Sequence, residues 1–217
     1  MVKSRPHVIL SAAMSMDGKI ATKTGDSKLS SKRDLIRVHK LRTHVDAILV
    51  GKHTVMIDDP MLTVKYVKGK NPTRIILDSN ASIKSTSKII KSCKSIPTII
   101  VVSEKATQKN IIRLKREGLE IIKCGQNKIN LRKLLRILRK KNIKSLLVEG
   151  GGLTNWSFIK YGLVDEIIVT ITPYVIGGSR AISLFQGKGF AKISHAPILK
   201  LKKINRIKNE LVLHYAI

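Results

Sequence analysis

The sequence has few aromatic residues, few cysteines and no long apolar run, and each shortage argues against a class of protein. Aromatic residues make up 4% of the 217 residues, so few rings are present on which nucleobases could stack. The two cysteines, Cys93 and Cys124, form neither a CxxC motif nor a Cys/His zinc spacing. Unpaired thiols suit a reducing cytosol, so we expect a cytoplasmic protein. No apolar run approaches the ~20 residues that span a bilayer, which predicts no membrane association.

Acidic residues are also scarce, because 14 Asp and Glu stand against 42 Lys and Arg, a formal net charge of +28. This imbalance raises the question of nucleic-acid binding. The basic residues are spread over most of the chain, however, and no zinc-finger spacing or RNP-like aromatic motif occurs. We therefore favour a solvated basic surface that attracts small phosphorylated ligands. A basic nucleic-acid-binding module is the alternative from another class.

Apolar runs of strand length alternate with amphipathic stretches of helix length, which predicts one α/β domain over residues 1–217. Strands are expected at His7–Met14, Ala47–Gly51, Arg74–Asp78, Thr98–Val102, Leu119–Lys123, Ser145–Glu149 and Glu166–Thr172, with a loop over 15–30. Helices are expected at Lys32–His44 after the N-cap Ser31, at Lys105–Glu117, Asn130–Lys141 and Leu153–Tyr161, with a helical turn that ends at Pro60. The tail alternates around Lys208–Asn209, which is typical of an antiparallel hairpin. The sum is a mostly parallel twisted sheet with an antiparallel C-terminal hairpin and helices on both faces.

One motif stands where such sheets bind ligands, at the carboxyl end of a strand. In VEGGGLTNW (Val148–Trp156), three glycines follow a single carboxylate. Glycines at a strand-to-helix turn allow a phosphate to approach the backbone and the N–H groups of the helix start. The motif is not GxGxxG, because Asn155 occupies the third glycine position, and no P-loop occurs. A simple tight turn and a phosphate site both stay open from these residues alone.

Asp58 and Asp59, which precede Pro60, are the second candidate motif. Paired carboxylates can hold Mg²⁺ or act in acid/base chemistry. Asp before Pro is also a common turn former, and no third carboxylate is near in sequence. We therefore expect no metal site. Asp17, in MSMDGK, has two readings as well, an acid near a reacting centre or a turn-forming Asp-Gly.

Five blocks follow one another in order and spacing: SAAMSMDGKIA, DLIRVHKLRTHVDAILVGKHTVMIDDPMLTV, RIILDS, VEGGGLTNW and GLVDEIIVTITPYVIGG. Together they resemble the riboflavin-pathway reductases with a dihydrofolate-reductase-like fold, over essentially the whole chain. The likeness is greatest to the stand-alone 2,5-diamino-6-(ribosylamino)-4(3H)-pyrimidinone 5′-phosphate reductases of archaea and fungi.

The resemblance implies an NADPH-dependent reduction, with NADH as an alternative, of a phosphorylated pyrimidine whose ribosyl side chain becomes a ribityl chain. It assigns cofactor binding to Ala13, Thr54, Asp58, Ser79, Gly150, Gly151, Gly152 and Leu153. Substrate binding is assigned to Ser27, Arg42, Leu62, Lys65 and Glu149. We give Glu149 the catalytic role, because an acceptor-only side chain suits the donor-rich edge of a diaminopyrimidine or the ribose hydroxyls.

The resemblance fixes the form of the substrate less closely. The sequence lacks the HxE…PCxxC signature of a zinc deaminase, so we expect reduction of the diamino compound before deamination. Reduction of the deaminated uracil compound is the alternative, and dihydrofolate reduction is a further one.

Relatives also suggest a homodimer, for which the exposed edge near the C-terminal hairpin is a candidate interface.

Overall fold

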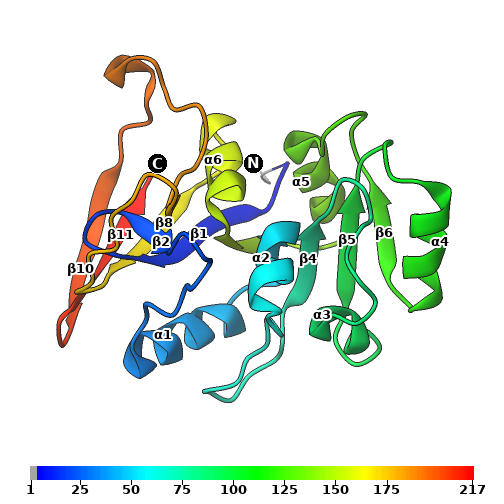
Figure 1. The fold of residues 1–217 in the computed structure, drawn as a ribbon, viewed down its shortest axis with the longest axis horizontal. Coiled ribbons are helices and arrows are strands. Elements are labelled where there is room, and N and C mark those ends of the chain that lie inside the picture. The colour runs from blue at the N-terminus through cyan, green and yellow to red at the C-terminus, as the bar shows by residue number, and fades with distance from the viewer. Residues whose placement is uncertain (1–3) are drawn as a thin grey trace. The chain divides into compact units, whose positions relative to one another are not determined.

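The computed structural model describes residues 4–217, and this part of the chain divides into two compact units. The first unit contains residues 4–7 and His39–Leu147, and the second contains Val8–Val38 and Val148–Ile217. The chain passes from one unit to the other within α1 (Lys32–Thr43) and β7 (Ser145–Gly150). Figure 1 labels the elements of both units along the chain.

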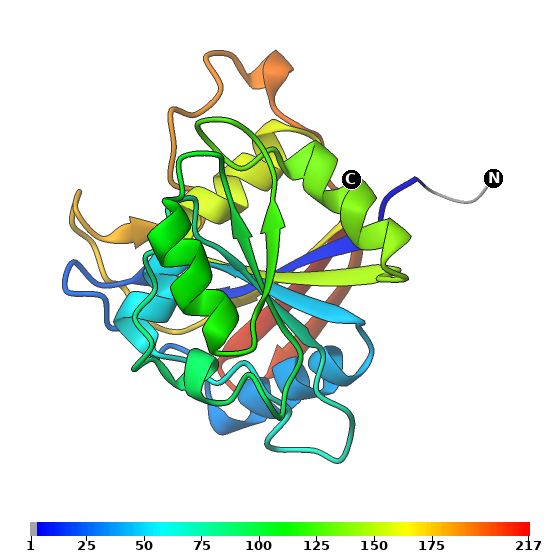
Figure 2. The ribbon, with the colours of Figure 1, turned by 90° about the vertical axis from the view of Figure 1, so that its right-hand side faces the viewer.

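The first unit is built on parallel strands, in the order β3 (Ala47–Gly51), β4 (Thr73–Leu77), β5 (Thr98–Val102) and β6 (Glu120–Lys123). Connections between parallel strands are right-handed. Helices that connect each strand to the next in the order β3 to β6 therefore lie on one face of the sheet, and a helix that connects β6 back to β7 lies on the other face. Accordingly α2 (Lys52–Asp58) and α4 (Gln108–Arg116) lie on one face, and α5 (Leu131–Lys140), which leads back towards β7, lies on the other (Figure 2). Both sides of the strands are therefore buried, as their apolar sequences require.

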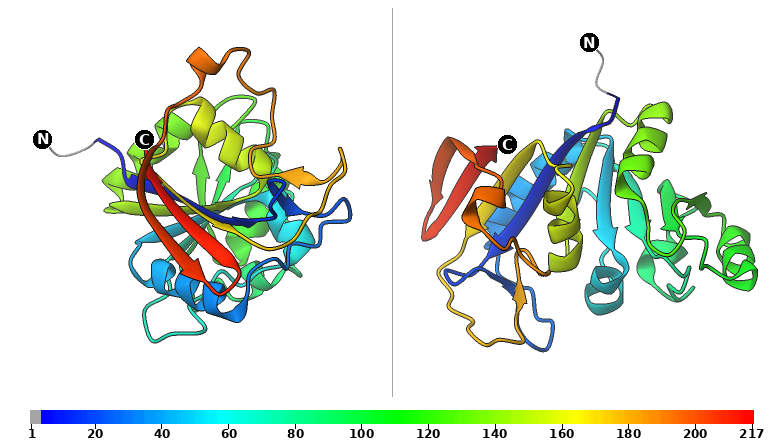
Figure 3. Two further views of the ribbon diagram at one scale, coloured as in Figure 1. Left: turned by 90° about the vertical axis from the view of Figure 1, so that its left-hand side faces the viewer. Right: turned by 90° about the horizontal axis from the view of Figure 1, so that it is seen from above.

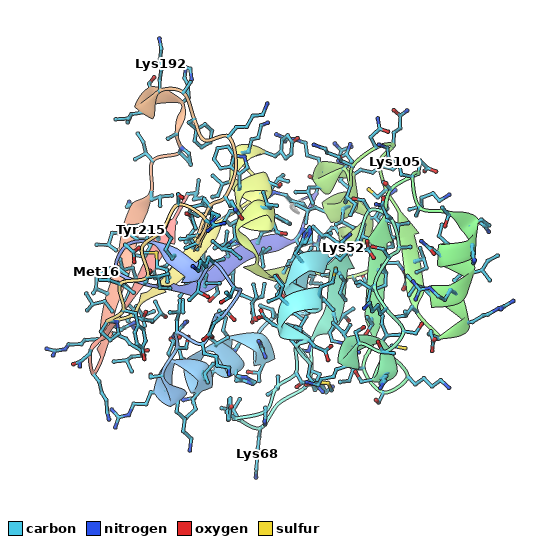
Figure 4. The ribbon with its side chains drawn as sticks, in the orientation of Figure 1. Met16, Lys52, Lys68, Lys105, Lys192 and Tyr215 are labelled. Carbon is cyan, nitrogen blue, oxygen red and sulfur yellow. The ribbon has the colours of Figure 1, made fainter. Side chains whose placement is uncertain are left out.

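The second unit combines a parallel pair with an antiparallel hairpin. Strand β8 (Glu166–Ile171) pairs parallel with β1 (His7–Met14) and antiparallel with β11 (Glu210–Ala216), which pairs in turn with β10 (Lys200–Ile207). Helix α6 (Gly152–Lys160) follows β7, and β2 (Lys19–Ala21) pairs with β9 (Ile182–Ser183). Before β10 the chain makes an excursion, orange in Figure 3, that carries η1 (Ile193–His195) and has Lys192 near its tip in Figure 4.

The predicted start of α1 is confirmed by its cap. The Ser31 hydroxyl accepts a hydrogen bond from the Asp34 N–H (3.2 Å), as an N-cap does. The Ser31 N–H donates to the buried Glu210 carboxylate (2.7 Å). The Asp34 carboxylate accepts hydrogen bonds from the hydroxyls of Ser30 and Thr170 (2.7 and 2.8 Å). The helix start is therefore fixed by both a local cap and long-range partners.

The predicted fold class is confirmed, and so are the seven strands and the hairpin turn at Lys208–Asn209. The start of α4 was wrong: the helix begins at Gln108, not Lys105, because the Thr107 side chain caps it by accepting from the Asn110 N–H. Four short elements were missed, namely β2, β9, η1 and α3 (Lys88–Lys91). These pieces have two to four residues, too few to show a period in the sequence.

The first unit contains a fully buried arginine, Arg74 in β4. Burial lowers the pKa of its guanidinium to about 10, so the group is still charged at neutral pH. It donates hydrogen bonds of 2.6–3.3 Å to neutral oxygens, which are Thr98 Oγ1, Ser92 Oγ and the carbonyls of Met61, Ile89 and Ile96. The charge is thereby satisfied by dipoles, as a buried charge must be satisfied by some partner. Arg74 ties its own strand to β5, to α3, to the turn between them and to the chain at Met61.

Replacing Arg74 with leucine should destabilise the protein by about 3 kcal/mol or more, because several buried oxygens would lose their donor. The free energy of unfolding from urea titrations measures the effect. Arg116→Leu, at an exposed position on α4, serves as the control and should stay within about 0.5 kcal/mol of the wild type. Equal unfolding midpoints for the two variants would contradict the structural role of Arg74.

Candidate functional site

In the first unit, a segment after α2 brings three of the predicted substrate residues together. This 61–66 segment (Met61–Tyr66) contains Leu62 and Lys65, and Arg42 reaches it from α1. Arg42 Nη1 donates to the Thr63 carbonyl (2.8 Å). The Lys65 N–H donates to His39 Nδ1 (2.8 Å), also on α1. The last turn of α1 therefore holds the segment that carries the candidate phosphate-binding residues.

The opposite side of the 61–66 segment is held by groups next to and within β4. The Val64 N–H donates to Asn71 Oδ1 (2.7 Å), and the Met61 carbonyl accepts from the buried Arg74 (3.2 Å). Leu62 has a left-handed backbone (φ 51°) and a side chain that is 4% exposed. Its side chain thus packs in the core of its unit, while Lys65 is exposed. In Figure 4, Lys68 marks the tip of the loop that continues from this segment to β4.

The predicted cofactor residues of the first unit lie at carboxyl ends of its strands. Thr54 and Asp58 lie one helical turn apart on α2, directly after β3, so they share a face. Ser79 follows β4, and its carbonyl accepts both the N–H and the hydroxyl of Ser103 (3.0 and 2.9 Å). These positions fit the rule that ligands of open α/β sheets bind beyond the carboxyl ends of the strands.

Asp59 ends α2 as a structural residue. It adopts the left-handed conformation (φ 40°) and its N–H donates to the Val55 carbonyl (3.1 Å), a typical C-cap before a proline. Its carboxylate accepts from the Lys88 N–H (2.8 Å). The reading of Asp58–Asp59–Pro60 as a helix stop is therefore confirmed. Within residues 4–217, no three His, Cys, Asp or Glu side chains are placed to hold a metal ion.

In the second unit, β7 ends at the predicted glycine turn. Glu149 is half-buried near the end of the strand, and Gly150 and Gly151 follow with φ of 77° and 84°, which disfavour residues with a Cβ. Gly151 is the N-cap of the nine-residue α6 and has no side chain to accept from the first turn, which contains no acidic residue. The N–H groups and the dipole of a helix start suit an anion. The turn therefore fits a phosphate group.

Close packing explains two of the three glycines. A Cβ on Gly150 would lie 2.5 Å from Asn155 Oδ1, and one on Gly152 would lie 2.3 Å from the Ser183 carbonyl oxygen. Asn155 is buried and donates from Nδ2 to the Leu184 carbonyl (3.0 Å). Asn155 thus takes the place of the third fingerprint glycine because it ties α6 to the chain after β9. Leu153, in the first turn, is 54% exposed.

The two other predicted residues of the second unit lie in different surroundings. Ala13 is half-buried in β1. Ser27 is exposed in the loop before α1, where its carbonyl accepts from the Leu29 N–H (2.8 Å). Sequence reasoning had assigned no role to His39, Arg74 or Asn155. His39 and Arg74 lie within two of the blocks that carry the resemblance, but nothing in those blocks marks their side chains, and Asn155 stood out only as a departure from GxGxxG.

Asp17 acts as a clamp in the second unit, because its carboxylate joins the turn after β1 to the loop after β8. Its carboxylate accepts from the N–H groups of Ile176 and Gly177 (2.9 and 2.8 Å) and from the Ser15 hydroxyl (2.7 Å). These hydrogen bonds, of which that from Ile176 has the largest effect, lower the pKa of Asp17 to about 2. A carboxyl group with this pKa is ionised at neutral pH and is a poor proton donor. The turn-forming reading of Asp17 is the one that its geometry favours.

The lowered pKa predicts a pH-dependent effect of Asp17→Asn. Because the pKa falls from its ordinary value of 3.8 to about 2, the ionised clamp stabilises the fold fully above pH 3.8 and loses this effect as the pH falls through 2. The variant should therefore be less stable than the wild type at pH 7, and the gap should narrow between about pH 4 and 2. Urea midpoints at several pH values measure it. A gap that does not change with pH would contradict the clamp.

Comparison with known proteins identifies the family. The model of the RibD C-terminal domain matches residues 6–213. The chain belongs to this family. A relative from Methanothermobacter thermautotrophicus, named 2,5-diamino-6-ribosylamino-4(3H)-pyrimidinone 5′-phosphate reductase, is 40% identical over 98% of this chain and 99% of its own length. The RibD-family chain described here is thus an oxidoreductase of the riboflavin pathway, as predicted.

Solved structures agree on the fold. RibD from Acinetobacter baumannii has a TM-score of 0.85 at 24% identity, with 99% of this chain and 58% of that chain covered. Dihydrofolate reductase from Enterococcus faecalis has a TM-score of 0.53 at 11% identity, with 97% of this chain and 95% of that chain covered. The dihydrofolate-reductase-like fold is thereby confirmed. Fold and family together imply a nicotinamide cofactor. Within the described residues, no helix is long and apolar enough to cross a membrane.

Proposed function

We propose that this reductase converts the ribosylamino side chain of 2,5-diamino-6-(ribosylamino)-4(3H)-pyrimidinone 5′-phosphate into a ribitylamino chain, with NADPH as reductant. The observation that carries the proposal is the match, along almost the whole length of both chains, to a relative named for this substrate. The held 61–66 segment and the glycine turn support it, because each offers a place for a phosphate.

The cofactor is held by backbone and small side chains. The turn Gly150–Leu153 takes its pyrophosphate, because the helix start supplies N–H donors and no carboxylate opposes the charge. Thr54, Asp58, Ser79 and Ala13 contact the rest of the cofactor. When bound, NADPH supplies the hydride that reduces C1′ of the ring-opened side chain. The protein's part is to bind, to orient and to exclude water.

The substrate is held by charge at one end and by acceptors at the other. Lys65 and Arg42 bind the 5′-phosphate, Arg42 with a planar guanidinium and Lys65 as a point charge. Leu62 contributes through its backbone, since its side chain is buried, and Ser27 adds a hydroxyl. Glu149 accepts hydrogen bonds from the amino groups of the pyrimidine or from the ribose hydroxyls. A fixed acceptor limits the poses of the bound substrate and so favours the reactive one.

NADPH oxidation with three substrates in parallel tests this proposal. The diamino compound, its deaminated uracil analogue and dihydrofolate are offered to the purified protein. Turnover of the diamino compound alone is the expected result. Turnover of the uracil analogue alone would place the enzyme after deamination, and turnover of dihydrofolate alone would overturn the proposed substrate class.

Glu149→Gln should lower turnover of the diamino compound by about tenfold or more, because an amide has one acceptor oxygen where the carboxylate has two. The free energy of unfolding should change little, since Glu149 is only half-buried. Steady-state kinetics and urea unfolding measure the two effects. Wild-type kinetics in this variant would contradict the role of Glu149.

We also propose that the chain forms a homodimer through β10. This eight-residue strand is at the edge of its sheet, and Leu201 and Ile204 on it are 47% and 56% exposed. The outer edge of an edge strand offers unpaired backbone N–H and C=O groups to another chain, and Leu201 and Ile204 add exposed apolar surface to this edge. Sedimentation should give a dimer of the 24.2 kDa chain.

Ile204→Lys should shift the dimer to monomer, since it replaces one of the two large exposed apolar side chains of β10 with a charge that strand pairing would bury. The control is Ile112→Lys, which changes an apolar residue of 40% exposure on α4 and should leave the dimer intact. Dissociation by both variants, or by neither, would contradict this interface.

A further inference from the structure

We propose that His39 is a positioning residue for phosphate binding, because it holds Lys65 and Arg42 in one cluster. The inference rests on the proposed function, in which these two side chains contact the substrate phosphate. His39 is 7% exposed and lies in the second half of α1.

The first contact is with the Lys65 backbone. His39 Nδ1 accepts the Lys65 N–H at 2.8 Å, which requires that this nitrogen carry no proton. The hydrogen bond fixes the backbone of the residue whose ammonium is to meet the phosphate. Lysine reaches its ligand through a flexible four-carbon stem, so a fixed backbone is the first condition for a defined ammonium position.

The second contact runs through an aromatic ring. The His39 ring packs edge-on against Tyr66, with centroids 4.7 Å apart and planes at 71°. The Lys65 ammonium lies 5.8 Å from the centroid of the same Tyr66 ring, within the range of a cation–π contact. His39 therefore supports both ends of Lys65, the backbone directly and the ammonium through Tyr66. Less freedom is then lost when the phosphate binds.

The third contact is with Arg42. Arg42 Nη1 lies 3.4 Å from His39 Nε2 and donates to the Thr63 carbonyl within the 61–66 segment. The Lys65 backbone N–H and the Arg42 guanidinium thus lie at opposite nitrogens of one imidazole, the first as a hydrogen-bond donor to Nδ1 and the second in packing contact with Nε2, which carries the proton of the neutral ring. A shift of this ring would move both cations, whereas neither cation is placed by the ring's charge. The role is geometric, so a neutral acceptor of the right shape should replace the histidine.

Two substitutions separate the acceptor from the ring. His39→Phe keeps an aromatic ring beside Tyr66 but has no acceptor, and His39→Asn keeps an acceptor at the place of Nδ1 but has no ring. We expect His39→Phe to raise KM for the diamino compound about tenfold, the scale of one hydrogen bond to a positioned group. Its kcat and its Kd for NADPH should stay within about twofold of the wild type. His39→Asn should recover most of the loss in KM.

His39→Gln moves the acceptor to the place of Nε2 and should be as impaired as His39→Phe, which keeps the test decisive if the phenylalanine variant does not fold. An unchanged KM in His39→Phe and His39→Gln would overturn the positioning role. A loss of kcat in His39→Asn as large as its loss of substrate affinity would also overturn it. The first result would show that the contact is not used, and the second that the residue only maintains the fold.

A binding measurement separates this inference from the proposed substrate. Ribose 5-phosphate is titrated by calorimetry into the wild type and the three variants. If the diamino compound is not turned over but ribose 5-phosphate binds about tenfold more weakly to His39→Phe than to the wild type and His39→Asn, the proposed substrate is wrong and the positioning role holds. Equal affinity in all four proteins, or no binding to the wild type, would overturn the role of His39.

Discussion

The buried guanidinium of Arg74 is the interaction on which the candidate substrate site of the first unit depends. It is a charge enclosed by neutral oxygens, and those oxygens belong to β5, α3, the turn between them and the start of the 61–66 segment. A buried cation must be satisfied at every donor, which makes its partners hard to move. The segment that carries Lys65 is therefore attached to a fully buried side chain of its unit. Arg42 and His39 then fix it from the other side.

The glycine turn of the second unit is also a candidate phosphate site, but it uses backbone groups and no charged side chain. Here no cation is needed, because the start of α6 presents backbone N–H groups and a helix dipole. The backbone can come close to a ligand because Gly150 and Gly151 have positive φ, and Asn155 and the chain after β9 hold the turn in place. The proposed recognition of phosphate thus depends on a few fixed groups. The net charge of +28 supplies a general attraction for anions but no geometry.

Much of the fold could be predicted because its signals are local. Ser31 as the cap of α1, the run Thr98–Val102 and the turn at Lys208–Asn209 each depend on a few neighbouring residues. The start of α4 was misplaced because two side chains, Lys105 and Thr107, are both plausible near a helix start and only Thr107 makes the capping bond. The α6 turn could be read from its glycines before the structure showed what they contact.

The supporting residues could not be predicted from the sequence. Arg74 reads as one more basic residue before an apolar run, and only the fold shows that its side chain turns into the core. His39 lies on the flank of an amphipathic helix, and its partner Lys65 is 26 residues away. Such roles arise from contacts between distant segments, which local patterns do not encode. The motifs therefore predicted candidate ligand-binding residues but not the residues that hold these candidates in place.

The most direct test of the central claim follows the hydride itself. The protein is incubated with the diamino substrate and with NADPH that carries deuterium at the transferable C4 position, and the product is analysed by mass spectrometry and NMR. The account predicts one deuterium at C1′ of a ribityl side chain, on a pyrimidine that still carries both amino groups. A product without deuterium at C1′, or with deuterium on the pyrimidine ring, would contradict it.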